Sequence, residues 1–174
     1  WEMENGEFCS GSGSSFKIIF CDIIIEGREV TRWRQPLFAA TGIATFGLLC
    51  CDDHGILKFL VKIKPEIGCF DGVEIGPTIQ TEAGSTEAQD CVSRLFFKKL
   101  GEGERILADV LLSEEGGRFF QEQNRNVIIL IEKKELPETI PGYVWSDYGT
   151  LNILTQINNC LNIQLRNLLS ILEI

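Results

Sequence analysis

A four-residue turn signature between two apolar runs constrains this chain more than any other feature. The runs at residues 43–51 and 56–64 are rich in strand-favouring residues, and Asp52-Asp53-His54-Gly55 separates them. Aspartate and glycine favour tight reversals, so the sequence predicts a hairpin with His54 in its turn. Because side chains alternate along a strand, the second run predicts one core face and one basic face: Phe59, Val61 and Ile63 against Lys58, Leu60, Lys62 and Lys64.

Further turn signals divide the rest of the chain into short elements. Strands are expected at residues 16–25, 29–35, 78–81, 104–112 and 127–132. Apolar spacing predicts a helix at 90–100 and two helices in the tail, the first capped by Thr150 and the second beginning at Asn162. This order predicts one compact unit over residues 1–174, of α+β or mixed-sheet α/β class with a helical C-terminus.

The charge balance limits the classes of partner. The chain of 174 residues has a formal net charge of −9, which argues against a nucleic-acid or anionic-membrane partner held by a broad basic field. An anionic ligand would need a local basic pocket. The apolar stretch at 16–25 carries Lys17 and Asp22 and is too short for a membrane span or a signal core.

Cysteine and histidine usage indicates the compartment and excludes some chemistry. The seven cysteines are odd in number, Cys50 and Cys51 are adjacent in an apolar run, and no CxxC spacing occurs. We expect reduced thiols in a cytoplasmic protein. The single His54 excludes a His-rich metal site and an obvious Ser-His-Asp triad. The chain opens on Trp1 rather than Met, which indicates an excised domain or a processed chain.

The segment SEEGGRFFQEQNRN at residues 113–126 has the highest density of chemically useful side chains. Two arginines suited to bidentate phosphate contacts stand beside two acids and two glycines. Composition favours a solvated amphipathic helix with one polar face: Glu114, Arg118, Glu122 and Arg125. The alternative is an anion-binding segment. Two other basic clusters, Arg28/Arg32/Arg34 and Lys62/Lys64, have acidic neighbours, which favours solvated ion pairs for each cluster taken alone.

Four motifs in a fixed order add information that composition does not contain. They are WxQP (33–36), PTxQ (77–80), SEEGGRF (113–119) and NxxxRxLL (162–169). They lie in EVTRWRQPLFAATGIATFGLL (29–49), VEIGPTIQ (73–80), VLLSEEGGRFFQEQNRN (110–126) and LNIQLRNLLSIL (161–172), with GILKFLVKIKPEIG (55–68) between the first two. In this combination the chain resembles the NDP-hexose 2,3-dehydratase family over essentially its whole length.

The resemblance implies a repeat and a fold. Proteins of that family carry two homologous repeats in tandem. This chain resembles a single repeat, and its motif sequences are closer to those of the second repeat. It is therefore either an excised half or a repeat that pairs with itself, as a homodimer, or with a homologous repeat. The implied fold is Nudix-type, a mixed β-sheet flanked by helices as an α/β/α sandwich.

The resemblance also implies a reaction, the loss of water from a nucleotide-linked 4-keto-6-deoxyhexose, with dTDP as the expected nucleotide. A base removes the C3 proton, the C2 hydroxyl leaves by β-elimination, and the product relaxes to a 3,4-diketo sugar. This chemistry demands no redox cofactor and no metal. Glu114 or Glu115 would be base or acid, and Lys62 or Lys64 would stabilise the enolate or donate to the leaving hydroxyl.

The same motifs imply the substrate contacts. Arg118 and Arg125 would bind the diphosphate, Thr78 and Gln80 the sugar or base edges, and Trp33 would offer a flat face to a ring. The other implied substrate-binding residues are Gln35, Glu66, Gly117, Phe119 and Asn126. Structural alternatives remain open: Trp33 can be core, Gln80 can close a turn, and Glu115 can cap its own helix.

Two other function classes stay beside the enzyme. A Nudix pyrophosphohydrolase needs several carboxylates converging on a metal, and Glu114-Glu115-Gly116 is the nearest fragment without its upstream partners. A non-catalytic sugar-nucleotide-binding or dimerisation repeat is the stronger alternative. It is favoured by the stretch at 81–85, which lacks the Tyr that follows this motif in first repeats.

Overall fold

The computed structural model describes residues 1–10, 14–83, 85, 90–114 and 117–172, and its chain divides into two compact units. Unit 1 consists of Trp1–Ala44, Glu82–Ser85 and Leu112–Asn124. Unit 2 consists of Thr45–Thr81, Thr86–Leu111 and Arg125–Ile174. The expectation that residues 1–174 form a single domain stays a prediction.

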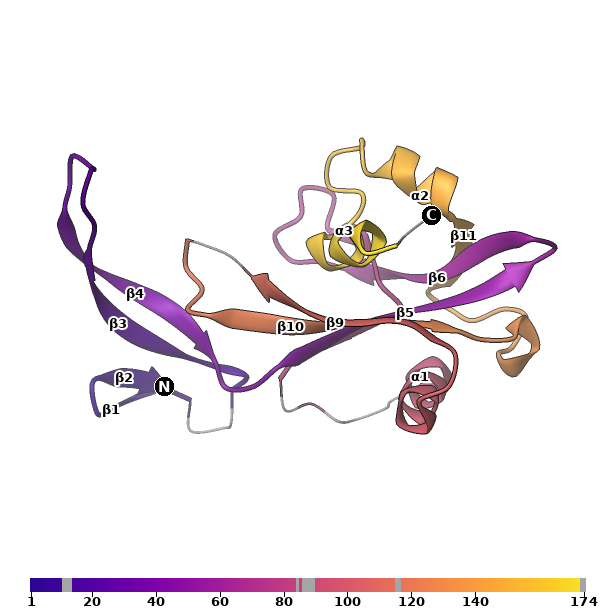
Figure 1. The fold of residues 1–174 in the computed structure, drawn as a ribbon, viewed down its shortest axis with the longest axis horizontal. Coiled ribbons are helices and arrows are strands. Elements are labelled where there is room, and N and C mark those ends of the chain that lie inside the picture. Colours follow the sequence, from indigo (N-terminus) through magenta and orange to yellow (C-terminus); the bar gives the residue numbers. More distant parts are fainter. Residues whose placement is uncertain (11–13, 84, 86–89, 115–116, 173–174) are drawn as a thin grey trace. The chain divides into compact units, whose positions relative to one another are not determined.

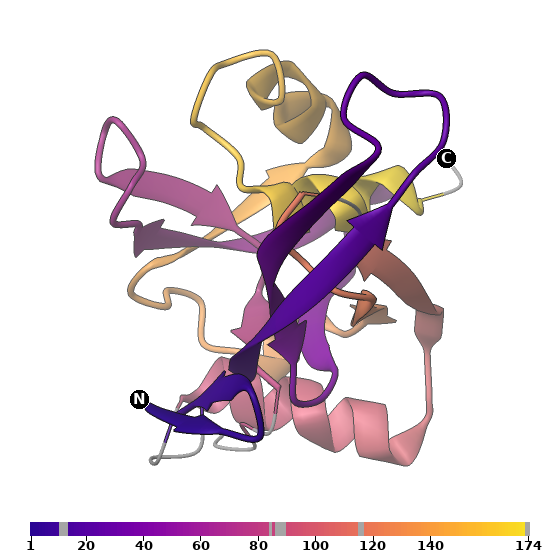
Figure 2. The ribbon, with the colours of Figure 1, turned by 90° about the vertical axis from the view of Figure 1, so that its left-hand side faces the viewer.

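Unit 1 contains a four-stranded sheet in the order β1-β2-β3-β4, and each neighbouring pair is antiparallel. The strands are β1 (Glu2–Glu4), β2 (Glu7–Cys9), β3 (Phe16–Ile24) and β4 (Arg32–Ala40). Strands β3 and β4 form the long hairpin of Figure 2, in which Cys21 lies opposite Gln35. The strand expected at 16–25 is confirmed, whereas the one expected at 29–35 starts later and continues past Pro36. Proline is tolerated there because β4 is an edge strand.

The second sheet has seven strands, most of whose residues belong to unit 2. Its order is β11-β6-β5-β10-β9, with β7 paired to β6 and β8 paired to β5. The strands are β5 (Ala44–Asp53), β6 (Ile56–Pro65), β7 (Val73–Gly76), β8 (Ile79–Thr81), β9 (Ile106–Glu114), β10 (Glu122–Leu130) and β11 (Tyr143–Asp147). The expected hairpin is confirmed as the antiparallel pair β5 and β6. His54 and Gly55 both have positive φ, 56° and 82°, as a two-residue turn of type I′ requires.

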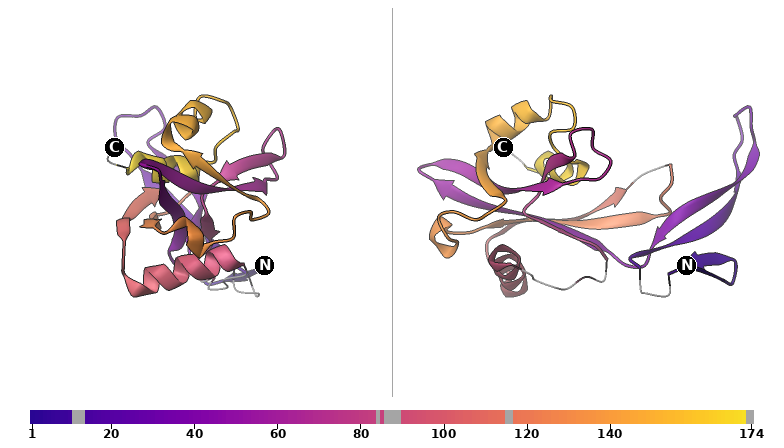
Figure 3. Two further views of the ribbon diagram at one scale, coloured as in Figure 1. Left: turned by 90° about the vertical axis from the view of Figure 1, so that its right-hand side faces the viewer. Right: turned by 180° about the vertical axis from the view of Figure 1, so that it is seen from behind.

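Helices cover both faces of this sheet in unit 2. Helix α1 (Cys91–Glu102) lies on one face, and α2 (Tyr148–Leu154) and α3 (Ile163–Ser170) lie on the other (Figures 1 and 3). A short 3₁₀ helix, η1 (Lys133–Glu135), follows β10. No helix among the described residues has the length and apolarity needed to cross a bilayer.

The helix ends follow local capping chemistry. The expected helices at 90–100 and after Asn162 are confirmed: Asp90 accepts from Ser93 N at 2.7 Å, and Asn162 accepts from Leu165 N at 2.9 Å. The expected cap at Thr150 is wrong. Asp147 caps α2 instead and accepts a 2.8 Å bond from the Thr150 amide, because its carboxylate reaches the third amide of the helix.

One core cluster of unit 2 lies between α1 and the sheet. Its buried members are Leu49, Leu60, Ile79, Val92, Phe96, Val127, Ile129, Ile131 and Leu136. The Phe96 ring packs against Gly47, where an added Cβ would lie 2.3 Å from ring carbons. A glycine at that point of β5 lets the helix approach the sheet closely.

The expectation of one core face and one basic face along β6 is wrong in the middle of the strand. Phe59, Leu60 and Val61 are all buried, so both faces of β6 are apolar at that point. The reason is the helical layer on each side, which makes β6 a central strand covered twice.

The segment at 113–126 is not a helix, which corrects the amphipathic-helix interpretation. β9 ends at Glu114, Gly117 and Arg118 lie in a turn, and β10 begins at Glu122. The i, i+4 spacing of charges is compatible with a helix, but pairing between β9 and β10 in the sheet determines the backbone.

Candidate functional site

Unit 1 contains a cavity of about 290 Å³ beside the Arg118 turn. Its wall combines three phenyl rings with small residues and three charged side chains. The lining residues are Ser15, Phe16, Phe38, Ala40, Gly42, Ala44, Glu82, Ala83, Arg118, Phe119 and Glu122. A cavity with apolar rings and few charged groups is typical of sites that bind a ring-containing polar ligand.

Backbone hydrogen bonds fix the Arg118 turn to the edge strand β4. The Phe38 amide donates to the Arg118 carbonyl at 2.7 Å, and the Phe120 amide donates to the Phe38 carbonyl at 2.8 Å. Gly117 has a φ of 64°, a left-handed conformation that glycine adopts without strain. The backbone of this turn is therefore held while the Arg118 side chain is exposed.

A side-chain contact adds a second attachment of the turn to β4. The Gln35 Nε2 donates to the Gly117 carbonyl at 2.7 Å, and the Gln35 Oε1 accepts from Trp33 Nε1 at 3.0 Å. The structure thus brings together two motifs, WxQP and SEEGGRF. Trp33 is half-buried and holds Gln35 in place.

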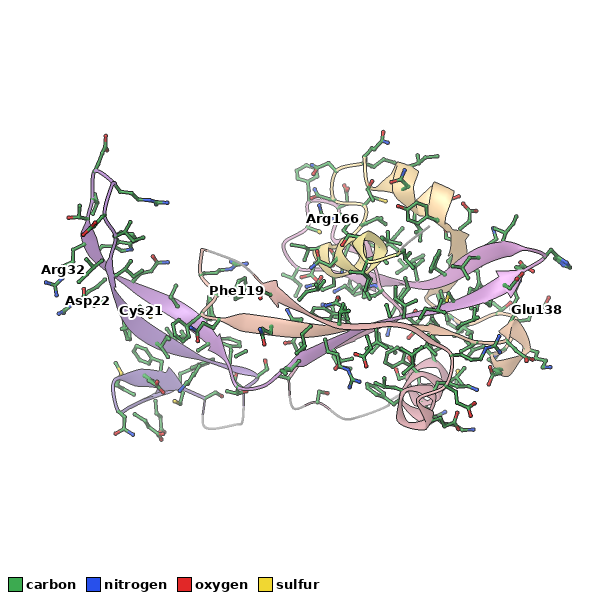
Figure 4. All side chains as sticks on the ribbon, viewed as in Figure 1. Cys21, Asp22, Arg32, Phe119, Glu138 and Arg166 are labelled. Carbon is green, nitrogen blue, oxygen red and sulfur yellow. The ribbon has the colours of Figure 1, made fainter. Side chains whose placement is uncertain are left out.

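Four aromatic rings form a row along this part of unit 1. Ring centroids lie 5.4 Å apart for Trp1 and Phe16, 5.1 Å for Phe16 and Phe38, and 6.3 Å for Phe38 and Phe119. Such spacings are those of favourable aromatic pairs. Phe119, labelled in Figure 4, is the last ring of the row and directly follows Arg118 in the chain.

The exposed Arg118 guanidinium lies beside the Phe119 ring. Its central carbon lies 5.2 Å from the Phe119 ring centroid, and no carboxylate of the described residues is within ion-pair distance of it. Two acids, Glu82 and Glu122, line the same cavity. The arrangement can therefore bind an anionic group at the guanidinium and offers carboxylates for proton transfer.

The SEEGGRF motif supplied two catalytic candidates, Glu114 and Glu115. Glu115 lies outside the described residues, and for Glu114 only the backbone at the end of β9 is described. Glu114 belongs to unit 1.

Lys62 and Lys64 lie in unit 2, two residues apart on β6, and both are partly buried. The Lys62 Nζ is 3.9 Å from Asp90 Oδ2 and 5.1 Å from the centroid of the Tyr143 ring. The Lys64 Nζ is 3.2 Å from Glu66 and 3.3 Å from Glu74. Both ammonium groups have carboxylate neighbours in the protein, and Glu66 is one of them.

The cluster around Lys62 includes a perturbed acid and phenol. The Tyr143 hydroxyl donates to Asp90 Oδ2 at 2.9 Å. Burial raises the pKa of Tyr143, and its bond to the Asp90 carboxylate raises it further. Burial alone would raise the pKa of Asp90, but hydrogen bonds from Ser93 and Tyr143 outweigh it, and that pKa is lowered.

Arg125 is already paired within unit 2. Its Nε and Nη2 donate to the two oxygens of Asp109 at 2.8 and 2.7 Å. The bond from Arg125 lowers the pKa of Asp109. A diphosphate would have to compete with this bidentate carboxylate, whereas Arg118, in unit 1, has no such competitor among the residues that the structure describes.

The remaining sequence candidates lie in unit 2 and hold the sheet and α3 together. Thr78 is buried, accepts from the Leu49 amide at 2.9 Å and donates to the Leu60 carbonyl. Gln80 accepts from Asn162 Nδ2 at 3.0 Å, so the PTxQ and NxxxRxLL motifs meet here. Asn126 is buried in β10.

Sequence reasoning missed several residues that the structure places in these sites. In the unit 1 cavity they are Phe16, Phe38, Glu82 and Glu122, and beside Lys62 they are Asp90 and Tyr143. Phe38 lies in the family-like segment 29–49 and Glu122 in the family-like segment 110–126. Their place in these segments was the one feature of the sequence that could have marked them as site residues. The others come from segments that only tertiary structure brings near.

The match to a family model covers residues 1–172, and the family is described as NDP-hexose 2,3-dehydratase. The chain belongs to this family. A dTDP-4-dehydro-6-deoxy-alpha-D-glucopyranose 2,3-dehydratase of Streptomyces violaceoruber is 32% identical to this NDP-hexose 2,3-dehydratase family member over 169 residues. The match covers 96% of this chain but 38% of the relative, so the chain spans well under half of the relative's length.

Solved structures resemble this family member in fold. An ADP compounds hydrolase matches with a TM-score of 0.50 at 12% identity, covering 95% of this chain and 89% of the other. A Nudix hydrolase from M. smegmatis, RenU, matches with a TM-score of 0.41 at 12% identity, covering 86% and 91%. At this identity the first likeness concerns the fold alone. The expected α+β class, a β-sheet flanked by helices with a helical C-terminus, is confirmed, and its fold resembles that of the ADP compounds hydrolase.

The described part of this NDP-hexose 2,3-dehydratase family member contains no cluster of side chains suited to bind a metal ion. Among those residues, no group of three or more His, Cys, Asp or Glu side chains is arranged to hold an ion.

Proposed function

We propose that this chain binds a dTDP-linked 4-keto-6-deoxyhexose in the cavity of unit 1 and takes part in its 2,3-dehydration. The observation that carries the proposal is the exposed Arg118 guanidinium, which has no ion-pair partner among the described residues and stands beside an aromatic-walled cavity. Membership of the NDP-hexose 2,3-dehydratase family and the name of the Streptomyces relative support the choice of ligand.

The cavity suits a nucleotide in two respects. A guanidinium is a rigid fork that binds phosphate oxygens through two parallel hydrogen bonds. The rings of Phe16, Phe38 and Phe119 offer apolar surface on which a thymine ring can stack. In a chain of net charge −9, Arg118 supplies the local positive potential that a diphosphate needs.

The reaction requires two proton carriers and an oxyanion donor. The C4 ketone acidifies the C3 hydrogen, a base takes that proton, and the electron pair forms an enolate. The enolate expels the C2 hydroxyl, which leaves as water after receiving a proton, and the resulting enol tautomerises to the 3,4-diketone. Glu82 and Glu122, in the cavity lining, join Glu114 and Glu115 as carboxylates for these transfers.

Binding separates this proposal from a purely structural role. Isothermal titration with dTDP should give a measurable affinity that Arg118→Ala lowers by about 10- to 100-fold, the worth of a charged hydrogen bond. Arg34→Ala is the matched control, because Arg34 is an exposed arginine of unit 1 that lies outside the cavity lining. Equal dTDP affinities for wild type and Arg118→Ala would show that the phosphates do not bind in this cavity.

Turnover separates the enzyme from a binding repeat. An assay for diketo product with the 4-keto substrate should show loss of activity in at least one of the variants Glu114→Gln, Glu115→Gln, Glu82→Gln and Glu122→Gln, with dTDP affinity retained. A binding-only repeat is the second candidate, since the chain spans only 38% of its relative. It predicts dTDP affinity with no diketo product from wild type.

The proposal also covers the pairing of this chain with a second repeat and its location in the cell. We infer that the chain works beside a second repeat, as a homodimer or with a homologous partner, because its relative is more than twice as long. A cytoplasmic location is supported by seven cysteines without a disulfide. Light scattering that gives a monomer at all concentrations, with full activity, would contradict the pairing.

A further inference from the structure

Unit 2 contains a polar cavity of about 200 Å³ that none of the roles above uses. One wall comes from the region around β7 through Cys69 and Glu74, and the other from the α2–α3 connection and the start of α3. Arg166, labelled in Figure 4, lies on α3 at this wall. The NxxxRxLL motif supplies both Asn162 and Arg166 and had no function assigned to it.

Asn162 lines the cavity and is held in place by hydrogen bonds within the protein. Its Nδ2 donates to Gln80 at 3.0 Å, its Oδ1 caps α3, and its amide donates to the Ile75 carbonyl at 2.9 Å. A Cβ on Gly76 would lie 3.0 Å from Asn162 Nδ2, so the strand and the asparagine are in close contact. These three polar groups of Asn162 are thereby used inside the protein, and its backbone carbonyl accepts from the Arg166 amide at 3.2 Å.

Other polar groups of the cavity have spare hydrogen-bonding capacity. The Arg166 side chain is exposed, and no carboxylate of the described residues forms an ion pair with it. The side-chain amides of Asn158 and Asn159 make no hydrogen bond within the described part of the chain. The Thr155 hydroxyl donates to the Asn152 carbonyl at 2.6 Å, which leaves its oxygen free to accept.

Glu74 supplies the acceptor on the opposite wall. Its carboxylate side chain is 11% exposed, with Oε1 at 3.3 Å from Lys64 and Oε2 accepting from the Cys69 thiol at 3.4 Å. A carboxylate accepts about four hydrogen bonds, so two contacts leave room for a ligand hydroxyl. The cavity therefore presents a guanidinium and amides that donate together with a carboxylate that accepts.

We propose that this cavity binds a neutral pyranose ring through its neighbouring hydroxyl groups. A sugar hydroxyl both donates and accepts, which matches the mixed lining of Glu74, Arg166 and the two amides. A multiply charged anion fits less well, because the Glu74 carboxylate faces it. The volume of about 200 Å³ is below the roughly 300–1,000 Å³ of pockets for drug-sized ligands, which favours one sugar ring over a whole nucleotide sugar.

The proposal is independent of the Arg118 site, which belongs to unit 1. Its test uses free D-glucose, D-galactose and 6-deoxy-D-glucose at millimolar concentration with the intact chain, read by saturation-transfer NMR. We expect ring-proton signals that weaken about tenfold or more in Arg166→Ala and in Asn158→Ala. Arg94→Ala, at an exposed arginine of α1 in the same unit, should keep them.

Cys69 gives a second readout because its thiol lines the cavity. Alkylation of Cys69, followed by peptide mass spectrometry, should slow several-fold in the presence of the sugar that binds. Alkylation of the exposed Cys91 should not change and serves as the internal reference. Protection of Cys69 that persists in Arg166→Ala would contradict the assignment.

Two results would overturn the proposal. The first is the absence of saturation transfer to all three sugars, or signals that survive in both Arg166→Ala and Asn158→Ala. The second is displacement of the sugar by inorganic phosphate, which would make this an oxyanion site. Failure of dTDP binding at Arg118 changes neither result, so the two proposals fail separately.

Discussion

The Gln35 side chain donates a 2.7 Å hydrogen bond to the carbonyl oxygen of Gly117, 82 residues further along the chain. This bond joins the WxQP and SEEGGRF motifs of the family in one unit. Gly117 precedes Arg118, so Gln35 acts on the proposed phosphate contact by holding the backbone from which the guanidinium extends. Gln35 is a positioning residue in this interpretation rather than a ligand contact.

Replacing Gln35 by Leu should loosen the Arg118 turn. We expect a loss of about 0.5–1.5 kcal/mol in the free energy of unfolding, the usual value of one hydrogen bond, together with weaker dTDP binding. Urea denaturation and titration calorimetry measure the two effects. Gln123→Leu, at an exposed position of β10, should change neither, and equal effects of both substitutions would contradict the positioning role.

Two glycine substitutions should change stability in opposite directions. Gly47→Ala places a Cβ 2.3 Å from the buried Phe96 ring and should cost about 1–3 kcal/mol of unfolding free energy through overpacking. Gly101→Ala meets no atom within 4 Å and lies in α1, so it should stabilise the protein by about 0.5–1 kcal/mol. Chemical denaturation of both variants is the measurement. A stable Gly47→Ala would disprove the close packing of α1 on β5.

Asp147 should contribute to acid sensitivity. Hydrogen bonds from the Thr150 amide and from Lys58 lower the pKa of Asp147 from 3.8 to about 2. A lowered folded-state pKa stabilises the protein above the unfolded value, and this stability is lost as pH falls from about 4 through about 2. The stability difference between wild type and Asp147→Asn should therefore be constant at neutral pH and shrink across that window. A difference that does not depend on pH would contradict the charge effect.

Tyr143→Phe should disturb the Lys62 cluster without removing its ring. The lost hydroxyl donates to Asp90, so we expect a cost of about 1 kcal/mol and a rise in the pKa of Asp90 toward its usual range. Carboxyl-carbon NMR titration follows the pKa, and denaturation follows the stability. Tyr148→Phe removes a hydroxyl that makes no hydrogen bond among the described residues and is the matched control. An unchanged Asp90 pKa would show that the bond is not formed in solution.

Local features of the chain were the predictable part of the fold. The β5–β6 hairpin, α1 after Asp90 and α3 after Asn162 each depend on residues a few positions apart, and their chemistry is visible in the sequence. The motif order also predicted the family and the fold class. Polar periodicity at 113–126 misled because a helix and a strand–turn–strand segment can carry the same charges.

Long-range packing was the unpredictable part. Nothing in the alternation along β6 reveals that helices cover both its faces and bury Leu60. The cavity beside Arg118 likewise depends on Phe16, Phe38 and Glu82, which reach it only through tertiary structure. Arg125 was expected beside Arg118 in function, but its partner Asp109 became visible only when β9 and β10 paired.

All seven cysteines are free thiols in the structure. Burial raises the pKa of Cys50 to about 12, so that thiol stays protonated and inert in ordinary buffers. Exposed Cys91 is the thiol through which two molecules can become cross-linked during storage. Reductant can thus be kept in every experiment described above except the alkylation, protecting the sample without removing any bond that holds the fold.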